Sequence, residues 1–108
     1  MIKAKVIKLQ NISNKDETNM YVRTGDIFIG QFVHWPEVGM SFHLLGFDGI
    51  RDEWDIKLRT TPITELIGDR EFRTLNSIYK IVTKEDERDE RIKIILQWGN
   101  PVKNVRIR

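Results

Sequence analysis

Hydrophobic and polar residues alternate along most of this chain with the period of two that is typical of β-strands. The alternation begins over residues 2–6, and the apolar phase then shifts by one position, which predicts a β-bulge or bend. Further strands are expected over residues 27–33, 41–47, 53–60, 63–67 and 72–82. Glycine, proline and aspartate interrupt the pattern and predict turns at residues 24–26, 36–39, 48–49 and 68–70.

The last quarter of the chain has a different composition. Residues 84–91 (KEDERDER) are all charged, and a helix is possible there because acidic and basic residues lie within i,i+4 reach of each other. Eight residues without an apolar stripe would form only a marginal helix, so we expect a solvated loop. Residues 92–98 and 102–107, separated by Gly-Asn-Pro, predict a C-terminal hairpin within 92–108. With 108 residues there is room for one hydrophobic core. The sequence therefore predicts a single all-β domain over 1–108, with its core in 1–83: a small antiparallel β-barrel or roll of about seven or eight short strands.

Composition narrows the class of protein. Hydrophobic residues make up 40% and charged residues 31%, an ordinary globular balance. The absence of cysteine removes disulfides and thiolate chemistry. No apolar run approaches the length of a membrane span, and the strand pattern starts at Ile2 without the features of a signal peptide. We expect a cytoplasmic protein that does not associate with membranes.

The charge distribution bears on possible partners. The net charge is +2, but residues 1–18 carry +2, residues 19–83 carry −2, residues 84–91 carry −2 and residues 92–108 carry +4. A duplex-binding protein concentrates basic residues on one face. General nucleic-acid binding is therefore disfavoured, although a barrel that binds nucleic acid through its basic terminal strands and Trp35 stays open as an alternative.

The sequence contains no recognisable catalytic or metal-binding set. His34 and His43 lie on different expected elements and have no further close ligands. No serine lies in a nucleophile motif, and no glycine-rich loop of the kind that cradles phosphate is present. We expect no enzymatic activity, no cofactor and no metal.

Two features are candidates for binding. Trp35 stands at a strand–turn junction beside Pro36, where a partly exposed indole can stack on a base or enter a pocket of a partner. The second feature is polar and combines two segments that would converge if their strands paired: Arg59, Thr60 and Thr61 with Arg73, Asn76 and Tyr79. These groups could bind a nucleotide or a protein backbone. Alternatively, and this is the interpretation we prefer, they satisfy backbone groups inside a small barrel.

Three segments carry a family resemblance. Residues 30–42 contain P-x-V-G, residues 58–63 read LRTTPI, and residues 72–79 read FRTLNSIY. This order resembles a loose group of small β-barrel proteins, many encoded by phages and mobile elements, with a T-[TS]-x-[VI] step followed by F-x-T-x-N-S-x-Y. The resemblance covers roughly residues 19–83. It implies an SH3-like or related barrel without enzymatic activity, and small phage-encoded barrels often block a host protein or sequester a nucleotide signal used in immunity.

Three hypotheses about function follow. The leading one is a non-catalytic binding module, a phage or mobile-element accessory protein that binds a host protein or sequesters a small nucleotide. In the nucleotide case the pocket is expected at the interface of a homo-oligomer, with Arg59, Arg73, Asn76 and Tyr79 facing it. The other two are the nucleic-acid-binding barrel and a structural component of a virion, in which exposed edge strands pair between copies.

Overall fold

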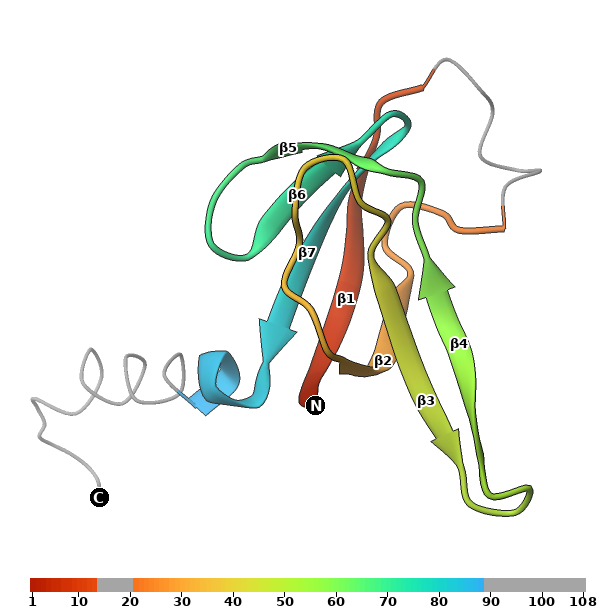
Figure 1. Ribbon diagram of the computed structural model, residues 1–108. Coiled ribbons are helices and arrows are strands. Elements are labelled where there is room, and N and C mark those ends of the chain that lie inside the picture. Colours follow the sequence, from red (N-terminus) through yellow and green to blue (C-terminus); the bar gives the residue numbers. More distant parts are fainter. Residues whose placement is uncertain (14–20, 89–108) are drawn as a thin grey trace, which may run out of the picture.

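The computed structural model describes residues 1–13 and 21–88, and within these ranges the chain forms seven strands. The strands are β1 (Ile2–Asn11), β2 (Ile27–Phe32), β3 (His43–Asp48), β4 (Glu53–Arg59), β5 (Ile63–Leu66), β6 (Glu71–Thr74) and β7 (Ser77–Thr83). They form one antiparallel sheet in the order β4-β3-β2-β1-β7-β6-β5, which curls into a roll (Figure 1). The prediction of a small antiparallel all-β roll is confirmed.

Strand β1 lies at the centre of the sheet, between β2 and β7. Its inner face carries Ala4, Val6 and Lys8, and the pairing with β7 shifts register between Lys8 and Gln10. The bulge therefore occurs later than the sequence pattern predicts, and a lysine takes the inner position. The Lys8 side chain is only 2% exposed, and its Nζ donates a hydrogen bond to the carbonyl of Val22 at 3.0 Å. This bond ties β1 to the segment that precedes β2.

Two close approaches of the backbone hold the roll together, one between neighbouring strands and one across the roll. At the first, β2 crosses β3 so tightly that a Cβ on Gly30 would collide with the carbonyl oxygen of Leu45, so only glycine fits there. At the second, the amide of Ile63 donates to the carbonyl of Met40 at 2.9 Å, and the amide of Gly39 donates to the carbonyl of Ile63 at 2.8 Å. The segment between β2 and β3 thereby covers the start of β5.

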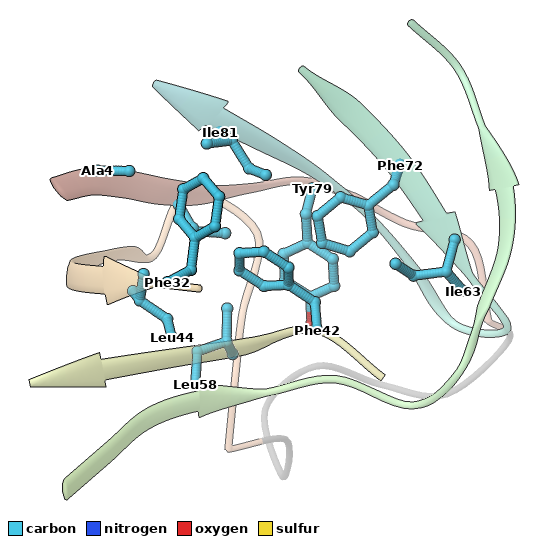
Figure 2. Close-up of a cluster of buried hydrophobic side chains, with 10 residues drawn as sticks. Ala4, Phe32, Phe42, Leu44, Leu58, Ile63, Phe72, Tyr79 and Ile81 are labelled. Atoms are coloured by element: carbon cyan, nitrogen blue, oxygen red, sulfur yellow. The ribbon is translucent and has the colours of Figure 1, made fainter. Parts of the chain in front are cut away.

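A chain of aromatic rings fills the interior of the roll (Figure 2). Phe42 lies between Phe32 and Phe72, with ring centroids 5.4 and 5.3 Å apart, and Phe72 stacks on Tyr79 at 5.4 Å. The three phenylalanines are at most 2% exposed. Aromatic pairs in such geometries stabilise a fold by about 0.5–1.5 kcal/mol each beyond the burial of their surface.

Strands β3 and β4 form a hairpin arm that extends past the rest of the roll (Figure 1). The predicted turn at residues 48–49 is confirmed, as part of a four-residue loop over residues 49–52. Arg51 fixes this loop through ion pairs with Asp48 at 2.7 Å, Glu53 at 2.8 Å and Asp55 at 2.6 Å. Its hydrogen bond to Asp48 is the largest of several contributions that lower the pKa of that carboxyl group.

The prediction of a single long strand over residues 72–82 is wrong. The chain reverses at Leu75 and Asn76, and β6 and β7 pair with each other as a hairpin. The Thr74 hydroxyl donates to the carbonyl of Ser77 at 3.3 Å across this turn, and the amide of Ile12 donates to the carbonyl of Asn76 at 2.8 Å. The sequence pattern does not predict this turn, because Leu-Asn lacks the glycine that marks most two-residue hairpin loops.

The prediction of a solvated loop over residues 84–91 is also wrong for the residues that the structure describes. Residues 84–88 are helical. Thr83 and Asp86 form a reciprocal cap at the N-terminal end of this helical segment. The Thr83 amide donates to Oδ2 of Asp86 at 3.0 Å, and the Asp86 amide donates to the Thr83 hydroxyl at 3.2 Å. Residues 89–91 of the expected loop and the expected hairpin over 92–108 lie outside the described residues.

Candidate functional site

The polar residues predicted around positions 59–61 lie on both faces of the sheet. Thr60 is buried beside Leu58, whereas Arg59, between them, points to the outer face and pairs with His43 of β3. The Thr60 hydroxyl accepts a hydrogen bond from the buried amide of Phe42 at 2.9 Å and donates one to the carbonyl of Thr61 at 2.8 Å. Thr60 is thus occupied in joining β4 to the start of β3.

The second predicted segment is divided in the same way. Tyr79 is 6% exposed and stacked in the core, and burial raises the pKa of its phenol, with an opposing contribution from its hydrogen bond with Ser77. Asn76 lies in the β6–β7 turn. Arg73 is exposed on the outer face, paired with Ile78 of β7 and Glu65 of β5. The structure therefore does not bring the hydroxyls and the guanidinium groups into one site.

Trp35 lies at one end of the roll and is 40% exposed. Its ring contacts Phe32 edge to face at 4.8 Å, and the guanidinium of Arg70 lies 4.7 Å from its centroid. Arg70 also donates to Asp86 at 2.8 Å, a hydrogen bond that raises the pKa of the arginine. Partial burial acts to raise the pKa of Asp86, but the hydrogen bonds from Arg70 and Thr83 together lower it. Trp35 thus connects the core to the helical residues 84–88.

A hollow of about 610 Å³ opens beside Trp35 on the side that lacks Arg70. Its walls include His34, Met40, His43 and Leu45. The volume lies within the range of pockets that hold small organic ligands. Because His43 pairs with Arg59, the register also places that arginine next to the hollow.

A second depression, of about 480 Å³, lies on the outer face of the sheet between the hairpin arm and the helical residues 84–88. We call it the lysine groove, because four lysines from three elements line it: Lys3 and Lys5 of β1, Lys57 of β4 and Lys84 of the helical residues 84–88. The apolar part of its lining comes from Ile29, Leu45, Phe47 and Val82.

Cross-strand pairing explains how the lysine groove combines charge with apolar surface. Lys5 pairs with Ile29 of β2 on one side and with Val82 of β7 on the other. Directly opposed residues of antiparallel strands project from the same face, so these three side chains form a row. Ile29 is 68% exposed and Phe47 is 50% exposed, which are large fractions for side chains of this size. The arrangement presents apolar surface with cations directly beside it.

The charge of the lysine groove is partly balanced by one acid. Glu87 lines the groove and pairs with Lys5 at 3.0 Å. Both side chains are substantially exposed, so the pair contributes little to stability. The amino-acid sequence alone does not predict this groove. The alternation of Lys3 and Lys5 with apolar residues was visible, but nothing in the sequence indicated that Lys57 and Lys84 lie at the same depression.

Other kinds of site were sought in the described ranges. Residues 1–13 and 21–88 contain no group of three or more histidine, aspartate or glutamate side chains placed to hold a metal ion. No helix in these ranges is long and apolar enough to cross a membrane. Compared with protein families, with curated proteins and with solved structures, the chain gives no match.

Proposed function

We propose that this protein is a non-catalytic binding module whose lysine groove holds an acidic, partly apolar segment of another protein. The observation that carries the proposal is the position of Lys3, Lys5, Lys57 and Lys84 around exposed apolar side chains, with Glu87 as the one acid among the described lining residues. Charge complementarity favours an acidic occupant, and the apolar lining favours one that also carries hydrophobic side chains.

The positive charge is local. Residues 1–13 and 21–88 contain twelve lysines and arginines and twelve aspartates and glutamates, so the described part of the chain is neutral as a whole. Nucleic-acid-binding surfaces combine an extended basic track with several aromatic platforms. Among the described residues that line the groove, Phe47 is the single aromatic one. These observations favour a protein segment over a nucleic acid.

A small anionic ligand with a planar ring is the second candidate, and it rests on a different place. The hollow beside Trp35 has a suitable volume and offers an indole, two imidazoles and, by register, Arg59. Of the seven candidate binding residues, Trp35 lines this hollow and Arg59 lies next to it. A phage or mobile-element origin and a host target stay predictions from the family resemblance.

Fluorescence anisotropy with three labelled probes tests the main proposal. The probes are a ten-residue peptide alternating glutamate with leucine and phenylalanine, the same peptide with lysine in place of glutamate, and single-stranded dT10. We expect the protein to bind the acidic peptide in preference to the other two. Preferential binding of dT10, with affinity that falls steeply as salt rises, would instead identify a nucleic-acid-binding surface.

A charge-reversed variant locates the binding. Lys3→Glu/Lys84→Glu replaces two exposed lysines of the groove, and we expect it to weaken binding of the acidic peptide about tenfold or more, which corresponds to about 1.4 kcal/mol or more. The matched control is Lys80→Glu, on the same outer face but outside the groove lining. Equal affinities for the wild type and the double variant would refute the assignment of the groove.

A further inference from the structure

The edge of strand β4 is open. β4 stands at one end of the sheet and pairs with β3 alone among the residues that the structure describes. At the opposite end, Gly39 and Met40 already bond to Ile63 at the start of β5. An open edge presents unpaired N–H and C=O groups that can accept another strand.

The order of charges along β4 selects the strand that would fit. Glu53 and Asp55 occupy its first half, and Lys57 and Arg59 occupy its second half. If a second β4 lies antiparallel to the first, the acidic half of each strand faces the basic half of the other. Parallel pairing would place like charges together, which is destabilising. The strand is therefore electrostatically self-complementary in one orientation only.

Apolar side chains flank the centre of this edge. Trp54 is 46% exposed and Ile56 is 52% exposed, and they pair with Phe47 and Leu45 of β3. The Trp54 and Phe47 rings also contact each other at 5.2 Å. A second copy placed along β4 would bring its own Trp54 and Ile56 against this surface and remove part of it from water.

We propose that two copies of this chain pair antiparallel along β4 around a two-fold axis at Ile56, so that their sheets become continuous. A two-fold axis makes the same patch serve both partners, as a self-complementary strand requires.

Lys57 is the extra residue of a bulge in β4, because Leu44 and Leu45 pair with Leu58 and Ile56. The bulge turns Arg59 to the face of Trp54 and Ile56, so the charge matching holds between the halves of the strands and not between directly opposed side chains. Arg51 binds Glu53 and Asp55, yet these carboxylates keep 53% and 38% of their side-chain surface exposed. The proposal does not rest on the lysine groove.

Sedimentation velocity of the full chain over a range of concentrations tests the pairing. We expect a dimer for the wild type, and monomers for Lys57→Glu/Arg59→Glu and for Glu53→Lys/Asp55→Lys, each of which makes the strand uniformly charged. An equimolar mixture of the two variants should restore the dimer. The control Arg73→Glu/Lys80→Glu makes the same change in net charge as Lys57→Glu/Arg59→Glu, but on β6 and β7, and should stay dimeric. Circular dichroism verifies that each variant is folded.

Cross-linking distinguishes the orientation, since the chain has no cysteine of its own. Ile56→Cys lies on the proposed axis, where opposed Cα atoms are about 4.5–5.5 Å apart and a disulfide can form. In Trp54→Cys the cysteines of the two copies would be offset along the strands by four residues, roughly 13 Å, and should not form a disulfide. A monomeric wild type, a dimer that survives both charge variants, failure of the mixture to associate, or cross-linking at both positions would overturn the proposal.

Discussion

The two faces of the sheet use their side chains in different ways. On the inner face, Phe32, Phe42 and Phe72 are almost completely buried, and the Thr60 hydroxyl is hydrogen-bonded to backbone groups. On the outer face, Ile29 remains 68% exposed although it lies in the middle of β2. The inner face thus stabilises the fold, whereas the outer face leaves apolar surface available for contacts with other molecules.

The comparison shows that a conspicuous sequence motif need not mark a binding site. The threonines and the serine in TTPI and FRTLNSIY stand out in the sequence, yet Thr60, Thr74 and Ser77 are buried and bond or pack within the roll. The lysine groove is assembled from common residues that form no motif. For a small roll such as this, recognition depends on which strands the topology places side by side.

Removing an aromatic ring from each face should give the largest contrast. Phe72→Ala deletes a buried ring between Phe42 and Tyr79, and we expect the free energy of unfolding to fall by about 3–5 kcal/mol. Phe47→Ala deletes a half-exposed ring that contacts Trp54, and the expected loss is about 1 kcal/mol. Urea denaturation measures both. Equal losses would contradict the assignment of the two faces.

Deleting one buried and one exposed hydroxyl should give an intermediate difference in the free energy of unfolding. Thr60→Val leaves the buried amide of Phe42 without its side-chain acceptor, and we expect a loss of about 1–3 kcal/mol in the free energy of unfolding. Thr64→Val removes an exposed hydroxyl that donates to the carbonyl of Arg73 at 3.2 Å, and less than about 0.5 kcal/mol should be lost. If Thr60→Val left the free energy of unfolding unchanged, this hydroxyl would not be required to close the roll.

The smallest expected effect concerns the contact between Asp86 and Arg70. The pKa of Asp86 is lower in the folded chain than its ordinary value of 3.8, so its stabilisation is fully present above that pH. The stabilisation disappears as pH falls further, through the folded pKa. We expect Asp86→Asn to lose less than about 1 kcal/mol at neutral pH and to respond less than the wild type to acid below pH 3.8.

Thermal unfolding from pH 7 into the acid range measures this difference. The control is Asp52→Asn, because Asp52 lies in the exposed hairpin loop with φ of 55°, a conformation that asparagine also tolerates. This control should keep the acid response of the wild type. Asp48, whose pKa is also lowered, is unchanged in both variants. Identical acid responses of all three proteins would exclude a contribution from Asp86.

The strands were the most predictable part of the structure, because burial of one face imposes a period of two on the sequence. The same period also explains why the proposed polar convergence failed. Arg59 lies between Leu58 and Thr60, so its side chain must leave the sheet on the opposite face. The alternation that separates Arg59 from Thr60 is present in the sequence, and it rules out a convergence that the shared polar composition of the two segments suggests.

Other features depend on contacts that a single sequence does not reveal. The inward position of Lys8 follows from its bond to Val22, fourteen residues away. The helical residues 84–88 have no apolar stripe, and they are held by the Thr83–Asp86 cap and by Arg70. The lysine groove likewise needs β4 and the end of β7 to approach the same part of β1. Such features become visible only when the elements are placed in space.

The bond from Lys8 to Val22 has a practical consequence for protein engineering. It fixes one side of the connection between β1 and β2, and the bonds of Lys8 with Asp26 and Gly25 anchor the same place through the backbone. When both ends of a connection are fixed in this way, doubling its length costs only about 0.6 kcal/mol in closure entropy. An insertion into this connection that preserves these three bonds should therefore cost little free energy of folding.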